Sequence, residues 1–414
     1  MKILVICQYY SPEPFRITDI CEELVKRGHE VTIVTGIPNY PMGRIYDGYR
    51  HGERRDEVIN GVKVHRCFTI GRRSGAVWRL LNYYSYMLSS THYVSKIKDS
   101  FDVVFVNQLS PVMMANAAIK YKKKHHTKVV LYCLDLWPES LVVGGVKRGS
   151  AIYNFFYKVS EKIYKAVDSI LITSRSFAEF FEKEFGIKRT IYLPQYAEAL
   201  FTPEICKKES NDTIDLMFAG NVGAAQSVDT IIKAAALTQD IPNLKWHIVG
   251  DGSELERLQA MAQGMNQVIF HGRKSLEEMP MYYSMADAML VTMQKDPVLS
   301  LTLPGKVQSY MAAGKPIIGA IDGEAKRVIE QTQCGYCVPS GDFDGLAKIC
   351  MEVADKRAEY AAFGSRSRAA YEQMFSRDRF MNSLEQHFCD MCASTTQKQP
   401  IVSGDFAPGM EESK

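Results

Sequence analysis

Short apolar runs alternate with stretches of helical periodicity along most of this chain. The apolar runs are rich in β-branched residues and are bounded by turn-forming residues, as strands are. Apolar residues between them recur at the spacing of one helix face. This alternation indicates βαβ units with parallel strands. In the first half it predicts helices at Ile17–Arg27 and Met113–Lys123, and strands at Ile3–Cys7, Val31–Thr35, Val62–Arg66, Val103–Val106, Val129–Cys133, Ser169–Ile172 and Thr190–Leu193.

The alternation lapses in a polar segment around residues 196–213 and then resumes. We therefore predict a first domain over residues 1–195, a linker over 196–213 and a second domain over 214–376. The second series predicts helices at Val228–Leu237, Glu254–Met261 and Leu276–Ser284, and strands at Leu216–Ala219, Lys245–Val249, Val268–His271, Ala288–Val291 and Pro316–Gly319.

The fold class predicted from this order is α/β, with two doubly wound, Rossmann-like parallel sheets. Such sheets bind ligands beyond the carboxyl ends of their strands, so two facing sheets make one cleft with two walls. A terminal helix is expected at 377–392, as a segment able to cross back to the first domain. The tail 393–414 mixes Thr, Gln, Pro, Gly and Ser, and this composition predicts disorder.

Composition agrees with a two-domain globular protein. The chain is 46% hydrophobic and 23% charged, a composition typical of soluble domains. Its 414 residues are too many for one ordinary hydrophobic core. No apolar run reaches the roughly 18 residues of a membrane span. The opening residues turn polar too soon for a signal peptide, and Lys2 to Gln8 indicate a buried strand. These features predict a cytoplasmic protein.

The ten cysteines include two pairs at CxxC spacing. Cys334 with Cys337 and Cys389 with Cys392 would supply four thiolates for zinc. The competing interpretation places the first pair in a turn before a strand and the second near the end of the last helix. We favour that interpretation, because distant ligand pairs require the fold to bring them together. No metal is expected.

The segment Ser300–Ile318 has the chemistry of an anion site. Pro304 opens a predicted helix and Gly314 ends it, which is the usual asymmetry of helix termini. Lys306 then lies at a helix start beside amide groups that have no partner within the helix. A phosphate is the anion best suited to that environment. The alternative is a solvated surface lysine.

Charge is distributed unevenly along the chain. Residues 1–195 contain 29 basic and 18 acidic residues, and the remainder contains 21 and 29. Basic residues also mix with aromatic ones in 72–88 and 153–165. Basic amphipathic surface with aromatic anchors suits an anionic membrane surface, although core-facing aromatics with a solvated basic face are the alternative for either stretch. A basic surface also suits nucleic acid, but the chain has no nucleic-acid motif.

Several motifs, taken together, resemble the family 4 glycosyltransferases of the GT-B fold. The resemblance covers Lys2 to about Phe388. It rests on the order and spacing of four motifs, Arg27-Gly-His-Glu-Val-Thr-Ile-Val-Thr35, Phe218-Ala-Gly-Asn-Val-Gly223, Ile248-Val-Gly-Asp-Gly252 and Ala312-Ala-Gly-Lys-Pro316.

A narrower resemblance is to bacterial O-antigen and capsule transferases that transfer N-acetyl-L-fucosamine. It implies sugar transfer from a nucleotide donor with retention of configuration, usually without metal. The motifs that carry it are Ser11-Pro-Glu-Pro-Phe-Arg-Ile17, Gly36-Ile-Pro-Asn-Tyr-Pro41 with Gly48-Tyr-Arg50, Asp135-Leu-Trp-Pro-Glu139, Gln195-Tyr-Ala-Glu198 and Asn221-Val-Gly-Ala-Ala-Gln226.

The chain departs from the family pattern in the donor domain. The family commonly carries two glutamates eight positions apart, one contacting the donor sugar and one the ribose. The resemblance places them at Leu301 and Ser309. The family's Arg and Lys on the diphosphate fall at Asn221 and Gln226.

The phosphate charge would then rest on Lys306 and on Arg16. Lys306, with Gly305 allowing close backbone approach, is our candidate for stabilising the departing diphosphate. Arg16 replaces a glycine of many family members, and from the opposite domain it would close on the diphosphate as a bidentate fork. A surface loop arginine is the alternative. Ser309 counts among the expected donor contacts through its aligned position.

Other donor contacts are expected where strands end. Gly220, Asn221 and Gly223 follow a predicted strand, and glycine there permits backbone approach to phosphate. The resemblance places the nucleobase near Asp251 and Arg273. Plain strand-to-helix turns and helix caps are the alternatives at all of these positions.

Acceptor contacts are expected after the strand Val129–Cys133. Asp135 lies near a sugar-contacting histidine of other family members, and would hold a sugar hydroxyl or act as a base. Trp137 offers an apolar face to a pyranose, and Glu139 adds a carboxylate. The alternative is a helix-capping Asp135 with Trp137 in the core.

The sequence thus predicts a cytoplasmic retaining glycosyltransferase attached to the inner face of the cell membrane. Its donor would be a nucleotide sugar and its acceptor a lipid-diphosphate-linked glycan in surface polysaccharide assembly. A nucleotide-sugar 2-epimerase of the same fold and a non-catalytic scaffold are the alternatives. A nicotinamide dehydrogenase shares only the sheet type, because the segment Gln8–Pro14 after the first strand lacks the glycine fingerprint.

Overall fold

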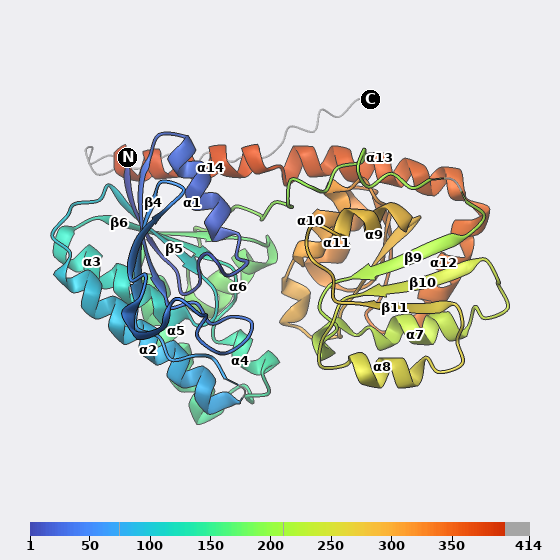
Figure 1. Cartoon of the computed structure of the whole chain (residues 1–414), viewed down its shortest axis with the longest axis horizontal. Coiled ribbons are helices and arrows are strands. Elements are labelled where there is room, and N and C mark those ends of the chain that lie inside the picture. The colour runs from blue at the N-terminus through green and yellow to red at the C-terminus, as the bar shows by residue number, and fades with distance from the viewer. Residues whose placement is uncertain (74, 210, 394–414) are drawn as a thin grey trace.

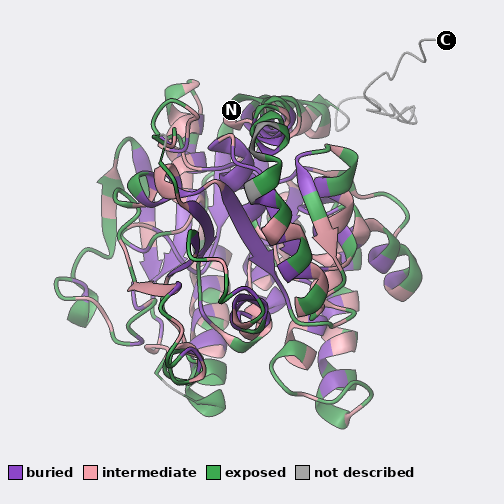
Figure 2. Cartoon of the chain, turned by 90° about the vertical axis from the view of Figure 1, so that its right-hand side faces the viewer, coloured by how far each residue is buried: buried purple, intermediate pink, exposed green. Residues whose placement is uncertain are grey.

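The computed structural model describes residues 1–73, 75–209 and 211–393. It contains two α/β domains that lie side by side, each built on one sheet with helices against it (Figure 1). The central strands are buried, while helices at the surface expose one face (Figure 2). The predicted fold class is therefore confirmed.

The first domain has a sheet of eight strands in the order β3-β4-β2-β1-β5-β6-β7-β8. All neighbouring pairs are parallel except β3 with β4, which form an antiparallel hairpin at the edge. The strands are β1 (Lys2–Ile6), β2 (Glu30–Gly36), β3 (Asp56–Ile59), β4 (Val62–Cys67), β5 (Val103–Gln108), β6 (Lys128–Cys133), β7 (Ser169–Ile172) and β8 (Ile191–Tyr192).

Helices cover both faces of this sheet. Alternate residues of β1 show why, since Leu4 and Ile6 pack in one apolar cluster and Ile3 and Val5 in the other. The part of the first basic and aromatic stretch from residue 76 onward lies on α2, and the second stretch lies on α5. The helices are α1 (Ile17–Lys26), α2 (Ala76–Lys96), α3 (Asn116–His125), α4 (Glu139–Val143), α5 (Ala151–Ala166) and α6 (Ser176–Phe185).

The second domain has six parallel strands in the order β11-β10-β9-β12-β13-β14. The strands are β9 (Ile214–Ala219), β10 (Leu244–Val249), β11 (Val268–Gly272), β12 (Ala288–Thr292), β13 (Ile317–Ala320) and β14 (Gly335–Val338). The helices are α7 (Asp229–Ala236), α8 (Leu255–Met261), α9 (Met279–Met285), α10 (Gly305–Ala312), α11 (Gly323–Gln331), α12 (Phe343–Asp355) and α13 (Arg357–Met374).

The last helix, α14 (Arg377–Ala393), returns to the first domain (Figure 1). Phe380, Met381 and Phe388 are fully buried in the cluster built around β1 and α1. Arg377 forms ion pairs with Asp19 at 2.7 Å and with Glu23 at 2.8 Å, both on α1. The helix therefore fastens the two ends of the chain together.

Between β8 and β9, the described residues form neither helix nor strand. The predicted tail 393–414 lies outside the described residues apart from Ala393. Within the described part of the chain, no helix combines the length and apolar character that crossing a membrane requires.

Candidate active site

The residues of the predicted anion site lie where α10 meets the carboxyl end of β9. Lys306 is the second residue of α10, and its Nζ donates a hydrogen bond of 2.8 Å to Oε1 of Gln226. The same Nζ lies 3.8 Å from the ring centroid of Phe218. Burial lowers the pKa of Lys306 to about 7 because a desolvated ammonium is disfavoured. A bound anion would therefore favour the protonated, charged form of this lysine.

Gly220 makes room for this lysine. It directly follows β9 with a φ of 144°, and a Cβ there would lie 3.0 Å from Nζ of Lys306. Gly223 is confined by the same turn, because its Cβ would lie 2.7 Å from Nδ2 of the exposed Asn221. The structure therefore brings Gly220, Gln226 and Lys306 together, and the anion they would bind stays a prediction.

Gly305 and Ser309 lie on the same helix as Lys306. Gly305 is exposed and has open space where a Cβ would stand. Ser309 is nearly buried, and its Oγ lies 3.3 Å from the carbonyl oxygen of Gly305 and 3.5 Å from Oε2 of Glu198. A carboxylate from the linker thus stands next to the residue aligned with the ribose-binding glutamate.

Arg16 is held by that same linker carboxylate. Its Nη2 lies 2.5 Å from Oε1 of Glu198, and its guanidinium packs 4.8 Å from the ring centroid of Tyr196. Arg16 therefore forms an ion pair between the first domain and the linker in this structure. Its expected contact with a diphosphate stays a prediction.

The two expected nucleobase contacts lie on loops after β10 and β11. Both side chains are exposed, and the carboxylate of Asp251 accepts a 2.8 Å hydrogen bond from the N–H of Gly252. Neither Asp251 nor Arg273 forms a hydrogen bond or ion pair with Lys306 within the described residues. Their role stays a prediction.

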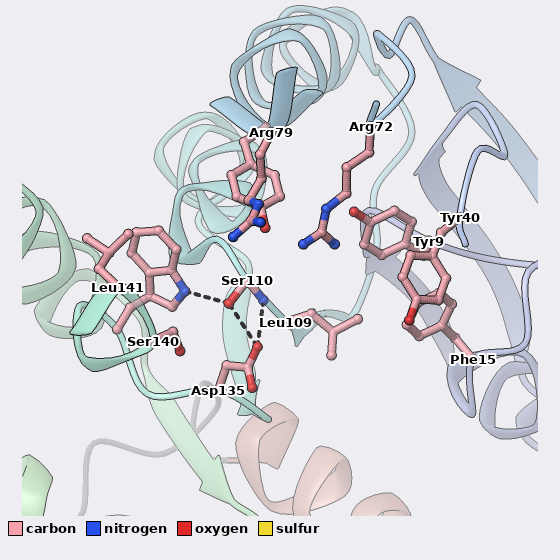
Figure 3. A pocket seen from close by; sticks show the side chains of 12 residues that line it. Tyr9, Phe15, Tyr40, Arg72, Arg79, Leu109, Ser110, Asp135, Ser140 and Leu141 are labelled. Atoms are coloured by element: carbon pink, nitrogen blue, oxygen red, sulfur yellow. Dashed lines mark hydrogen bonds between the residues drawn. The ribbon is translucent and has the colours of Figure 1, made fainter. Parts of the chain in front are cut away.

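A cavity of about 250 Å³ opens at the carboxyl edge of the first sheet (Figure 3). Loops after β1, β2, β5 and β6 contribute to it together with the start of α2. The side chains that line it are Tyr9, Phe15, Tyr40, Arg72, Arg79, Tyr83, Leu109, Ser110, Asp135, Trp137, Ser140 and Leu141.

Asp135 lies in the wall of this cavity and is fixed by Ser110. Its Oδ2 accepts hydrogen bonds from the N–H of Ser110 at 3.1 Å and from its hydroxyl at 2.9 Å. Burial raises the pKa of Asp135 above its ordinary value. A half-buried, oriented carboxylate of this kind suits a sugar hydroxyl.

Trp137 supports this arrangement from the core. Its Nε1 donates a 2.9 Å hydrogen bond to Oγ of Ser110, and its ring packs edge-on against Phe156. Only 2% of Trp137 is exposed. Trp137 lines the cavity, but most of its surface is buried in the core. This is the alternative to sugar stacking that the sequence leaves open.

The acceptor contact expected from Glu139 stays a prediction. In this structure the buried carboxylate does not line the cavity. It accepts hydrogen bonds from Tyr153 at 2.6 Å and from Arg148 at 2.8 Å. The first turn of α4 directs it toward α5, so it joins these two helices.

Some site residues were missed at the sequence level. Arg72 and Arg79 line the cavity, although the sequence indicated them only as membrane contacts. Glu198 contacts Ser309 and Ser110 contacts Asp135, and no local sequence pattern predicts either contact. A run of basic and aromatic residues was the only available sign of the arginine pair.

The two domains also touch at a point away from Lys306. On α11, the buried Glu324 accepts hydrogen bonds from the N–H of Arg175 at 3.2 Å and from Oγ of Ser176 at 2.8 Å. These groups begin α6 in the first domain. Ser174, just before them, donates to the carbonyl oxygen of Leu301 in the second domain.

Among residues 1–73, 75–209 and 211–393, no group of three or more His, Cys, Asp or Glu side chains has a metal-binding arrangement. The cysteines are free thiols.

Two family models match the chain, one in each half. A glycosyl transferase 4-like domain matches residues 15–194, and glycosyl transferases group 1 matches residues 204–370. The chain is 26% identical over 376 residues to WcaI of Escherichia coli K12, which carries the name of a colanic acid biosynthesis glycosyl transferase. That alignment covers 85% of this chain and 88% of WcaI.

Solved structures share the architecture. The sucrose-phosphate synthase of Thermosynechococcus elongatus superposes with a TM-score of 0.71 at 16% identity, over 95% of this chain and 99% of that one. HepE of Anabaena, in complex with UDP-glucose, gives a TM-score of 0.66 at 14% identity, over 95% and 100%. At these identities the likeness establishes the fold.

Proposed function

We propose that this chain, which belongs to the glycosyltransferases of the GT-B fold through a matching domain in each half, transfers a sugar from a nucleotide-diphosphate donor to a lipid-linked saccharide. The donor sugar we propose is an N-acetylated 6-deoxyhexosamine. The process is the assembly of an O-antigen, capsule or exopolysaccharide. The similarity to WcaI, named for colanic acid biosynthesis, supports this process.

The environment of Lys306 is the observation that carries the proposal. The lysine lies at a helix start, is largely desolvated, and stands beside a glycine turn with open space at Gly305. Preorganised cations and amides of this kind stabilise a departing diphosphate best, because they cost no reorganisation during the reaction. The donor would therefore lie against the second domain and the acceptor in the cavity of the first.

Retention of configuration would follow front-face attack. The acceptor oxygen forms the new bond to the anomeric carbon as the bond to the diphosphate breaks, and the leaving phosphate oxygen takes the acceptor proton. Lys306 would neutralise the charge that develops on the leaving group. Since an ammonium supplies this charge, we propose that no metal is needed, and activity in excess EDTA tests that point.

Turnover of nucleotide sugars tests the function. A thermal-shift screen of nucleoside diphosphates and their sugars identifies the donor base, and product analysis with isolated lipid-linked acceptors then measures transfer. We expect Lys306→Ala to reduce turnover about 100-fold at saturating donor. Lys348→Ala, which removes an exposed lysine of α12, is the matched control. Near-normal turnover of Lys306→Ala would overturn the assignment.

Two simpler outcomes would replace the proposal. Conversion of a UDP-sugar to its epimer without any acceptor would establish a 2-epimerase. Absence of nucleotide binding throughout the screen would indicate a scaffold.

We also propose attachment to the cytoplasmic face of an anionic membrane. Exposed apolar side chains stand among basic ones on α2 and α5, including Val77, Trp78, Ile152 and Phe155. Surfaces of this composition bind anionic interfaces. Flotation of the full chain with vesicles should require anionic lipid and weaken with salt, and equal flotation with neutral vesicles would contradict the proposal.

A further inference from the structure

Two arginine side chains turn into the cavity of the first domain from the side opposite Asp135. Arg72 precedes α2 and Arg79 lies in its first turn, and both guanidinium groups face the space above Ser110 and Asp135 (Figure 3). A cavity with two cations on one wall and a carboxylate on the other can bind a molecule that carries both a hydroxyl and an anionic group.

Neither arginine has a carboxylate at ion-pair distance among the described residues. Other arginines of this domain do, as Arg27 with Glu385 and Arg66 with Glu57 illustrate.

Arg72 is half-buried. Burial disfavours its charged form, but the nearby tyrosines Tyr9, Tyr83 and Tyr40 act in the opposite sense, so the pKa of its guanidinium is raised. Its charge also acts on Asp135 across the cavity. Because Asp135 is beyond ion-pair distance, this half-buried cation is costly unless a ligand supplies a closer counter-ion, so the arginine pair indicates an anion site.

Aromatic rings form the adjacent wall of the cavity. Tyr9 and Phe15 stack with ring centroids 4.9 Å apart, and Tyr40 packs against both at 5.7 and 5.2 Å. Such a wall suits the apolar face of a sugar ring. The ligand implied is therefore a sugar with an anionic substituent.

The surface beside Arg79 indicates what else the ligand carries. Val77 is 68% exposed, and Trp78, Leu80 and Leu81 are also exposed on the same turns of α2. An apolar surface next to an anion site suits a phosphate that is attached to a hydrocarbon chain.

We propose that this cavity binds the phosphate group that joins the acceptor saccharide to its lipid carrier. The guanidinium groups of Arg72 and Arg79 hold the phosphate oxygens as bidentate forks. The first sugar then lies against the aromatic wall, with a hydroxyl toward Asp135, and the lipid chain leaves along α2. This inference rests on the proposed function, because it places the acceptor of the proposed glycosyl transfer in this cavity.

Binding of farnesyl diphosphate to the full chain tests the inference. Farnesol, inorganic pyrophosphate and methyl glucuronide are the comparison probes, which separate the contributions of chain, phosphate and a sugar carboxylate. The measurements are made with Lys306→Ala in the background, so that the donor site does not contribute. We expect farnesyl diphosphate to bind more tightly than all three comparison probes.

Two variants and one control assign the residues. Arg72→Ala and Arg79→Ala should each weaken farnesyl diphosphate binding about tenfold to a hundredfold, the loss expected for hydrogen bonds between charged groups. Arg79 is exposed, so its variant keeps the fold even if Arg72→Ala does not. Arg189→Ala is the matched control. This exposed arginine precedes β8 and so lies at the amino edge of the sheet, opposite the carboxyl edge where the cavity opens.

The outcomes separate this inference from the proposed function. Unchanged binding in Arg79→Ala overturns the anion site, and so does failure of farnesyl diphosphate to bind. Equal affinity for pyrophosphate overturns the lipid-linked source, and tighter binding of methyl glucuronide would reassign the site to an acidic sugar. Nucleotide-sugar binding to the wild-type chain, measured alongside, tests the glycosyltransferase itself.

Discussion

Glu198 joins the two domains through Arg16, with 2.5 Å between Oε1 of the glutamate and Nη2 of the arginine. The second carboxylate oxygen lies 3.5 Å from Oγ of Ser309 on the donor helix α10. Ser309 is the position at which the family resemblance expects the ribose-binding glutamate. A serine is too short to replace that side chain, but the linker brings a carboxylate to the same place.

We expect Glu198→Gln to weaken selection for the donor ribose. In the wild-type chain, the 2′-deoxyribose form of the active nucleotide sugar should have a KM about tenfold higher than the ribose form, because a charged hydrogen bond is lost. The variant should treat both forms alike. Glu209→Gln, an exposed linker position, is the control and should keep the wild-type ratio. A ratio unchanged in Glu198→Gln would exclude the ribose contact.

Donor binding should weaken as the pH rises. The pKa of Lys306 is lowered to about 7 in the free protein, and a bound diphosphate raises it by favouring the ammonium. Binding therefore takes up protons, so the donor Kd should increase above pH 7 by up to about tenfold per pH unit, until the pKa of the complex is reached. Lys306→Arg keeps its charge and should remove this dependence. Titration calorimetry between pH 6 and 9 measures both, and a flat wild-type profile would contradict the expectation.

Elements with local signals were predictable. The predicted strand Ser169–Ile172 has the bounds that the structure gives to β7. The sequence also predicts Lys306 at the start of α10, because Pro304 precedes that helix and Gly314 follows it. The edge strand β3 was missed, although Asn60 and Gly61 both have positive φ in a two-residue hairpin turn that favours such residues. Its four residues, Asp56–Ile59, are too few and too polar to show a strand pattern.

Contacts between distant segments could not be predicted in the same way. Gln226 and Lys306 are 80 residues apart, and Arg16 and Glu198 are 182 apart. Such pairs depend on how helices pack on their sheets and on how the domains meet. The local hydrophobic periodicity of the sequence contains no information on either. Glu139 shows the same limit, because its contacts with Tyr153 and Arg148 follow from the packing of α4 against α5.

Gly220→Ala should damage the anion site and the fold together. A φ of 144° is strained for any residue with a Cβ, and the added carbon would lie 3.0 Å from Nζ of Lys306. We expect a loss of about 1–3 kcal/mol in the free energy of unfolding, measured by urea denaturation. Gly305→Ala is the control, since its Cβ would meet no atom within 4 Å. That variant should keep its stability yet bind donor less tightly, and an equal loss of stability in both would contradict the argument.

Asp135 and Glu139 should separate cleanly by their effects. Asp135→Asn removes the charge that orients an acceptor hydroxyl, so we expect turnover to fall about 100-fold with the fold retained. Glu139→Gln leaves the cavity unchanged and weakens the contacts to Tyr153 and Arg148. It should keep kcat within about twofold while losing about 1–3 kcal/mol of stability. Steady-state kinetics and thermal unfolding of both variants provide the test, and a large kcat loss in Glu139→Gln would support its predicted role as an acceptor contact.

Glu324 should control how tightly the domains close. Its carboxylate accepts from Ser176 and from the N–H of Arg175 at the start of α6, where a negative charge also complements the helix dipole. Glu324→Ala leaves these donors without their partner, so we expect about 1–2 kcal/mol less stability and a larger radius of gyration in solution scattering. Hydrolysis of the donor without acceptor should rise, because closure excludes water from the cleft.

Glu330→Ala is the matched control for this change. Glu330 is exposed on the same helix, and its ion pair with Lys326 spans 3.8 Å within α11. An exposed pair of this kind contributes little, so the variant should keep the wild-type dimensions and hydrolysis rate. If Glu324→Ala also kept both, the contact between α11 and α6 would be incidental to closure. Faster hydrolysis with unchanged dimensions would instead assign Glu324 a local role in excluding water.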